Sequence, residues 1–143
     1  MLVSQILKGK GDLVFTASPH DTVAAAAALL HARRVGAMVV LDDGGAIAGI
    51  LSERDIVRLV AELGAQALGR PISTCMTRDV VVADPGESID DLLERMTDRR
   101  IRHLPVVRGG RLVGIISIGD LVKHKISETQ AEADGLKAYI AAG

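Results

Sequence analysis

Two short segments of the sequence carry the same pair of polar residues, a serine followed three positions later by an aspartate. They are residues 52–55 (SERD) and 117–120 (SIGD), and each lies between a β-rich apolar run and a helical pattern. A serine at such a junction is a preferred helix N-cap, and an aspartate in the first turn complements the helix dipole. A purely structural role is therefore one interpretation of both pairs.

The same geometry also suits a ligand. A carboxylate held at the start of a helix can accept hydrogen bonds from both hydroxyls of a ribose, as the acidic residue of dinucleotide-binding folds does. We therefore predict that Asp55 and Asp120 bind ribose.

Positive charge is concentrated just before the second of these segments. Residues 98–103 (DRRIRH) contain three arginines and a histidine, and Arg54 lies inside the first serine–aspartate segment. Arginine presents planar, forked donors that match phosphate oxygens. A solvated helix end, favourable to the dipole, is the alternative that we favour for Arg33 and Arg99.

These features belong to an internal duplication. Residues 14–42 align with 80–108, and residues 44–60 align with 109–125 after one residue is dropped in a turn. The identities fall at the turn glycines and at the serine–aspartate pair, where chance would not concentrate them. Repeats of this kind are units of supersecondary structure that pack against each other.

Each copy predicts a β-α-β-β-α unit, and the alternation indicates an α/β (α+β) fold. The first helix of each copy has an N-cap, Thr22 or Ser88, and a glycine pair makes each hairpin turn. The predicted strands are 14–16, 37–41 and 47–51, then 80–82, 104–107 and 112–117; the predicted helices are 23–34 and 53–63, then 89–99 and 118–126. Outside the copies we predict a leading helix at 3–8, one helical turn after Pro71, and a helical tail at 127–142.

The composition narrows the classes of function. Hydrophobic residues make up 48%, charged residues 24%, and the net charge is −1, so nothing indicates a nucleic-acid partner. Phe15 and Tyr139 are the sole aromatic residues, which leaves no platform for stacking single-stranded bases. The length suits one compact domain or two small ones that share a core.

Other signals are absent from the sequence. Cys75 is the single cysteine, so no internal disulfide forms, and no histidine–cysteine cluster offers a metal site. No apolar run approaches the roughly 18 residues that span a membrane, and no signal peptide is visible. A phosphate-binding loop of the GxxxxGK type and a paired nucleophile and base are also missing. We expect a cytoplasmic protein that is not an enzyme.

The repeat resembles the cystathionine-β-synthase (CBS) domain family in its tandem-pair form, over residues 2–126. The motifs that carry this resemblance are Met76-Thr77, VGAMVV at 35–40, GILSERD at 49–55, IRHLPVV at 101–107 and GIISIGD at 114–120. The resemblance implies two copies packed about a pseudo-two-fold axis with two clefts, a Bateman-type module. It also implies a homodimer formed through the helices of the CBS repeats.

On this basis we divide the chain into four parts. The leader and first repeat occupy 1–63, the linker 64–79, the second repeat 80–126, and the tail 127–143.

The resemblance also implies which residues would hold a nucleotide. Asp55 and Asp120 would bind ribose, with Ser52 and Ser117 assisting. The adenine slot would be lined in the second copy by Val80, Val81, Ile101 and Ile116, and in the first by Val14, Phe15, Val35, Gly36, Ala37 and Leu51. The phosphate ligands would be Arg54, Arg100, Arg102 and His103.

The two clefts are not equivalent, because Gly36-Ala37 replaces Arg102-His103 in the first copy. AMP fits a cleft with two or three cations best, while ADP, ATP, NAD(H) and S-adenosylmethionine share its adenosine; no metal is required. We expect a regulatory sensor whose ligand changes the contacts of an unidentified client protein. The alternative is an interaction module that docks a client enzyme without a ligand.

Overall fold

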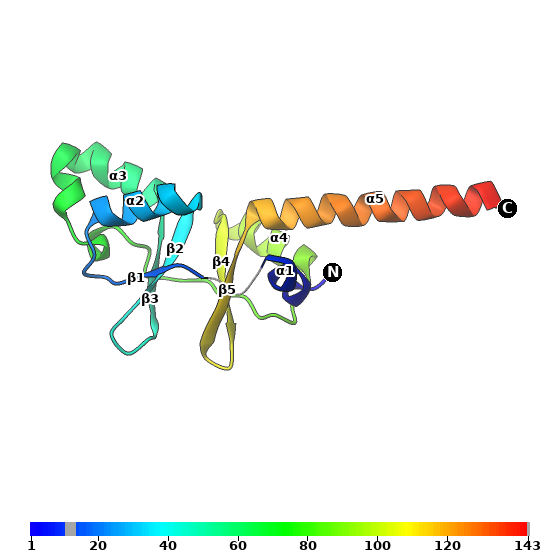
Figure 1. Ribbon diagram of the computed structural model, residues 1–143, viewed down its shortest axis with the longest axis horizontal. Helices are drawn as coiled ribbons and strands as arrows, with labels where there is room; N and C mark the ends of the chain where they lie inside the picture. The colour runs from blue at the N-terminus through cyan, green and yellow to red at the C-terminus, as the bar shows by residue number, and fades with distance from the viewer. Residues whose placement is uncertain (11–13, 143) are drawn as a thin grey trace. The chain divides into compact units, whose positions relative to one another are not determined.

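The computed structural model describes residues 1–10 and 14–142, which divide into two compact units with one repeat each. The first-repeat unit is Leu13–Val81, and the second-repeat unit joins Met1–Asp12 to Val82–Gly143 (Figure 1). The leader thus folds with the second repeat, although it precedes the first in the chain. The linker folds with the first repeat, which it follows.

A three-stranded sheet forms the centre of the first-repeat unit. Strand β1 (Thr16–Ala17) pairs in parallel with β2 (Ala37–Leu41), which forms an antiparallel hairpin with β3 (Ile47–Ser52). Helix α2 (Val23–Arg33) connects β1 to β2, and α3 (Glu53–Leu63) follows β3, so that the two helices lie side by side (Figure 1). The predicted order of elements in this copy is confirmed.

The core of this unit joins the repeat to the linker. It contains Val23, Ala26, Leu30, Met38, Val40, Leu51 and Leu59 from the repeat, and Ala67, Ile72 and Met76 from the linker. The linker forms two short 3₁₀ helices, η1 (Gly64–Gly69) and η2 (Ile72–Thr74). The second is the turn predicted after Pro71, whereas η1 was not predicted.

The linker ends in a backbone pairing with the sheet. The N–H groups of Ile50 and Thr77 each donate to the other's carbonyl at 2.9 Å. This reciprocal pair places the Met76-Thr77 motif against the last strand of the first repeat.

An antiparallel hairpin and three helices make up the second-repeat unit. Strands β4 (His103–Arg108) and β5 (Arg111–Ser117) pair with each other, and helices α4 (Ile89–Arg99), α5 (Ile118–Ala142) and α1 (Val3–Lys10) accompany them. The buried core consists of Val3, Ile6, Ala83, Ile89, Leu92, Met96, Leu104, Val106, Ile116 and Leu121.

The predicted strand at 80–82 is wrong, because only a single parallel bridge forms, between Ala83 and Val106. A parallel ladder extended toward Val81 would need an N–H from residue 105, and Pro105 has none. The first copy has Val39 at the aligned position, and there β1 pairs over two residues. The strand predicted at 14–16 is correspondingly found at Thr16–Ala17.

Helix α1 is fixed to the second repeat by its backbone as well as by its apolar face. The Val3 N–H donates to the Glu87 carbonyl and the Ser4 N–H to the Pro85 carbonyl, both at 2.9 Å. Val3 and Ile6 are almost fully buried. The leading helix predicted at 3–8 is therefore confirmed, and it ends two residues later, at Lys10.

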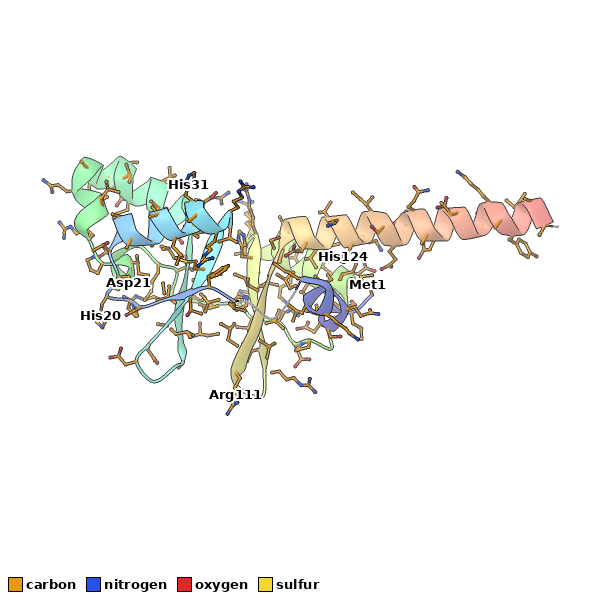
Figure 2. The ribbon with its side chains drawn as sticks, viewed as in Figure 1. Met1, His20, Asp21, His31, Arg111 and His124 are labelled. Carbon is orange, nitrogen blue, oxygen red and sulfur yellow. The ribbon has the colours of Figure 1, made fainter. Side chains whose placement is uncertain are left out.

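The helices predicted at 118–126 and 127–142 are one continuous helix, α5. Leu121 is its one buried residue within the described part, and past His124 the side chains of α5 extend away from the helix on all sides (Figure 2). The sequence has no proline or glycine at the boundary between the two predicted helices, and Gly135 lies well inside the second of them.

Two equivalent glycines, Gly49 in β3 and Gly114 in β5, allow a close approach by the segment that packs against each repeat. A Cβ built on Gly49 would lie 2.7 Å from the Thr77 carbonyl oxygen, and one on Gly114 would lie 2.4 Å from Leu7 Cδ2. The first neighbour is backbone, while the second is the end of a flexible side chain.

We therefore predict that Gly49→Ala lowers the free energy of unfolding by about 1–3 kcal/mol, as overpacking does, and that Gly114→Ala lowers it less. Gly135→Ala is the control, because a Cβ there meets nothing within 4 Å; in an exposed helix it should stabilise by about 0.5–1 kcal/mol. Urea unfolding curves measure all three. Equal losses at Gly49 and Gly114 would contradict the packing described.

Candidate functional site

The serine and aspartate of the first repeat form a capping box. Ser52 ends β3 and caps α3: the Asp55 N–H donates to Ser52 Oγ at 3.3 Å, and the Ser52 N–H donates to Asp55 Oδ2 at 3.0 Å. The structural interpretation of this pair is confirmed. The pair fixes the direction in which the chain leaves the sheet.

Asp55 is the one charged residue in the buried core of the described chain, at 4% exposure. The Thr77 hydroxyl donates to its Oδ1 at 3.5 Å, and Arg58 Nη1 lies 3.7 Å from the same oxygen. Both carboxylate oxygens thus have partners already. A ribose at this position would have to replace them.

Asp120 occupies the same place in the second repeat with a different neighbour. Its N–H donates to Ser117 Oγ at 3.1 Å, and its Oδ2 accepts from the Ser117 N–H at 2.9 Å. Lys10 Nζ donates to the same Oδ2 at 2.6 Å and to the Ile115 carbonyl at 2.9 Å. The Asp120 side chain is 26% exposed, against 5% for Asp55.

Sequence reasoning missed Lys10. The signal was available, because Lys10 lies 66 positions before Met76 and so aligns with the motif that precedes the second copy. Partial burial raises the pKa of Asp120, but hydrogen bonds from Lys10 and from Ser117 outweigh it and hold that pKa below its ordinary value. The carboxylate is therefore ionised at neutral pH.

Two of the predicted phosphate ligands lie beside this aspartate. His103 is the cross-strand partner of Ser117, and the Arg102 carbonyl accepts from the Ile118 N–H at 2.8 Å. In the first repeat Ala37 opposes Ser52 in the same register. The two junctions therefore share a backbone arrangement but carry different side chains.

Arg100 and Arg54 lie further from this pairing. Arg100 ends α4 in the left-handed conformation, with φ 54°, and its N–H caps the helix. Arg54 is exposed in the first turn of α3. Arg33, which we interpreted as a solvated helix end, instead lies over the Phe15 ring at 4.6 Å, a cation–π contact.

The residues predicted for the adenine slot differ in burial and in the unit to which they belong. Leu51, Ala37 and Ile116 are buried in the sheets, which supports the alternative of plain core packing for their side chains. Phe15 is partly buried against the same core, Val14 precedes it, and Ile101 is half-buried before β4. Val80 and Val81 fall in the first-repeat unit, whereas Ile101 and Ile116 fall in the second-repeat unit.

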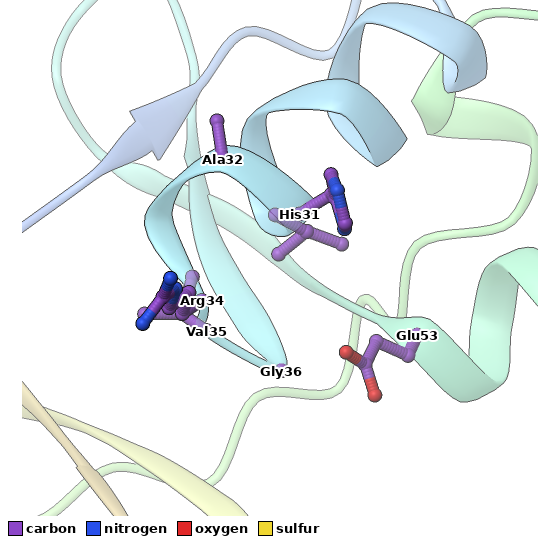
Figure 3. Close-up of a pocket in the computed structure, with 7 residues that line it drawn as sticks. His31, Ala32, Arg34, Val35, Gly36 and Glu53 are labelled. Carbon is purple, nitrogen blue, oxygen red and sulfur yellow. The ribbon is translucent and has the colours of Figure 1, made fainter.

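An open hollow lies where α2 ends and β2 begins (Figure 3). Its volume is about 670 Å³, and it is lined by Leu30, His31, Ala32, Arg34, Val35, Gly36 and Glu53. Two of the predicted slot residues, Val35 and Gly36, thus share a hollow with His31 and Arg34, which supply donors and positive charge. Glu53 and Arg34 lie on opposite sides of Gly36 (Figure 3).

Other classes of site find little support in the described residues. Residues 1–10 and 14–142 contain no cluster of three histidine, cysteine, aspartate or glutamate residues that would hold a metal ion. Burial and the nearby Asp55 carboxylate raise the pKa of the Cys75 thiol, so it stays protonated and unreactive. Within the same residues, no helix has the length and apolar character to cross a membrane.

Comparison with known proteins agrees with this geometry. The CBS domain model matches residues 11–62 and 72–127. The mitochondrial CBS domain-containing protein CBSX3 of Arabidopsis thaliana is 32% identical over 99% of this chain and 72% of its own. YhcV of Bacillus subtilis, also a CBS domain-containing protein, is 36% identical over 82% of this chain and 83% of its own.

Solved structures share the fold. The CBS-domain protein ATU1752 of Agrobacterium tumefaciens superposes with a TM-score of 0.84 at 45% identity, covering 87% of this chain and 92% of that one. PAE2072 of Pyrobaculum aerophilum, solved with AMP, has a TM-score of 0.75 at 27% identity, covering 84% of this chain and 89% of that one. The CBS pair of MJ0100, solved with 5′-methylthioadenosine and S-adenosyl-L-methionine, has a TM-score of 0.79 at 26% identity, covering 90% of this chain and 98% of that one. The chain therefore belongs to the CBS domain family, and it carries two CBS repeats in tandem.

Proposed function

We propose that this protein is a regulatory module that binds an adenine nucleotide, AMP first, at the Ser117–Asp120 junction of its second repeat. One observation carries the proposal: a partly exposed, ionised carboxylate is held at the start of α5 with a lysine against it. Two structural relatives support the ligand class, since PAE2072 was solved with AMP and MJ0100 with adenosyl ligands. The cytoplasm is the compartment we propose.

The second repeat is the better nucleotide site of the two. Its carboxylate is partly exposed and contacts Lys10, and Arg102 and His103 lie at the same strand-to-helix junction. Asp55 is buried, and both of its oxygens are engaged. The first repeat has an open hollow of its own, where Val35 and Gly36 leave room for a planar base.

Ligand binding would act on helix α5, because Asp120 lies in its first turn. A ligand shifts a conformational equilibrium only by its different affinities for the two states. Exposed apolar residues of helices, Val57 and Val60 on α3 and Val122 and Ile126 on α5, offer surface to a second copy and to a client protein. Nothing in the proposal requires a reaction of the nucleotide or a metal.

The alternative is a scaffold that works without ligand. The capping hydrogen bonds of Ser52 and Ser117 favour it, because they give the serine–aspartate pairs a structural role in both repeats.

We predict that AMP raises the melting temperature of the wild-type protein in differential scanning fluorimetry. A ligand at 100 times its dissociation constant stabilises by about 2.7 kcal/mol. ADP, ATP, NAD, NADH and S-adenosylmethionine form the rest of the panel. If none of these ligands raises the melting temperature of the wild type, the proposal fails and the ligand-independent scaffold is favoured.

We predict one tight site per chain and unequal roles for the two aspartates. Asp120→Asn keeps the size of the side chain but removes the charge, and it should weaken AMP binding at least tenfold, while Asp55→Asn should change affinity less than threefold. These factors correspond to about 1.4 and 0.6 kcal/mol. Isothermal titration calorimetry measures both, with the exposed Glu94→Ala as control. A larger effect at Asp55 would reverse the assignment.

We predict a homodimer formed through helices of the CBS repeats. Val57 is 67% exposed on α3, and Val57→Glu should convert dimer to monomer, because a buried, unpaired carboxylate is costly. Sedimentation velocity measures the state, and Lys8→Glu, on an exposed position of α1, is the control. A wild-type monomer at high micromolar concentration would contradict the prediction.

A further inference from the structure

The contact between Lys10 and Asp120 is built into the second-repeat unit. Helix α1 is fixed at its start by the Val3–Glu87 backbone hydrogen bond and by the burial of Val3 and Ile6. Its last residue, Lys10, then reaches two acceptors at once, Asp120 Oδ2 and the Ile115 carbonyl. A lysine held by two acceptors on adjacent elements has a defined position.

Within residues 1–10 and 14–142, no lysine contacts the carboxylate of the first repeat. The group that approaches Asp55 from the linker is the neutral hydroxyl of Thr77. Arg58, the nearby cation, comes from α3 itself and lies 3.7 Å away. The lysine is thus a feature of the second-repeat junction, beyond what the shared serine–aspartate motif provides.

We propose that Lys10 makes this junction selective for phosphorylated adenosine ligands over the bare nucleoside. The inference rests on the proposed function, because it concerns the same site. It assigns a role to a residue outside the serine–aspartate motif, and it gives a physical reason for a preference for phosphorylated ligands.

The distribution of hydrogen bonds on the carboxylate supports this role. Lys10 and the Ser117 N–H both bond Oδ2, while Oδ1 accepts no hydrogen bond from residues 1–10 or 14–142. A ribose presents two hydroxyl donors, so it occupies Oδ1 and competes with Lys10 for Oδ2. Binding therefore releases the ammonium from its charged partner.

The cost of that release depends on the ligand. A charge-assisted hydrogen bond is about twice as strong as a neutral one, and two hydroxyls alone replace it with weaker bonds. A phosphate supplies a new anion for the ammonium, whose four-carbon stem lets it move to a new partner. Lys10 thus penalises adenosine and favours AMP.

A purely structural salt bridge would behave differently. It would tie α1 to α5, and its loss would weaken folding without distinguishing one ligand from the other. The ratio of the two dissociation constants separates these cases.

The test is calorimetric titration of AMP and adenosine into the wild type, Lys10→Met and Lys10→Arg. Lys8→Met, also on α1, is the matched control. In Lys10→Met the preference for AMP over adenosine should fall by about tenfold, the size of one lost charged hydrogen bond. Lys10→Arg should keep most of the preference, and Lys8→Met should keep all of it.

An AMP-to-adenosine ratio that stays within twofold of wild type in Lys10→Met would overturn the inference. Circular dichroism melts show whether Lys10→Met is folded, and if it is not, the same ratio is measured in Lys10→Gln, which removes the charge and keeps a polar side chain. If the wild type binds neither ligand, the proposed function itself fails. If the wild type binds AMP, Asp120→Asn abolishes that binding, and Lys10→Met leaves the AMP-to-adenosine ratio unchanged, then only the role proposed for Lys10 is rejected.

Discussion

The hydrogen bonds between serine and aspartate at each strand-to-helix junction fix the position of the carboxylate on which the candidate site depends. At each junction a serine hydroxyl accepts from the aspartate N–H, and the carboxylate accepts from the serine N–H. These bonds satisfy donors that the start of a helix would otherwise leave unpaired. They also fix the carboxylate at the positive end of the helix dipole, which favours a negative charge there. The capping role gives both pairs a structural function, and the ribose contact that we propose for Asp120 is compatible with it because the side chain is partly exposed.

What distinguishes the two junctions comes from the segment that packs against each repeat. The linker places Thr77 against Asp55, and the leader places Lys10 against Asp120. The close approach needs a residue without a side chain on the facing strand, and both copies have glycine there, Gly49 and Gly114. Asp55 is buried beside a neutral hydroxyl, while Asp120 is partly exposed beside an ammonium. The duplication thus yields two similar frameworks with different electrostatics.

Much of the architecture followed from local patterns. The helices at 53–63 and 89–99 and the strand at 37–41 were predicted to the residue, because caps, glycine turns and apolar periodicity mark their ends. The strand at 80–82 failed for a reason that lies elsewhere in the sequence, since Pro105 removes the donor that its partner would supply. The helices at 118–126 and 127–142 merged because no proline or glycine lies at their boundary. The adenine slot was the least predictable feature, because its residues also serve as sheet core.

The sequence by itself determined the repeat, the capped junctions and the identity of the two carboxylates, because these depend on residue type and short spacing. Only the tertiary structure decided which segment packs on which repeat, since that choice depends on long-range burial of Val3, Ile6 and Ile72. It also decided that a lysine more than a hundred residues away, Lys10, is the charged partner of Asp120. The repeat offset aligns Lys10 with Met76, but it does not say which carboxylate the lysine contacts. That contact arises because α1 is fixed to the second repeat by its apolar face and its backbone.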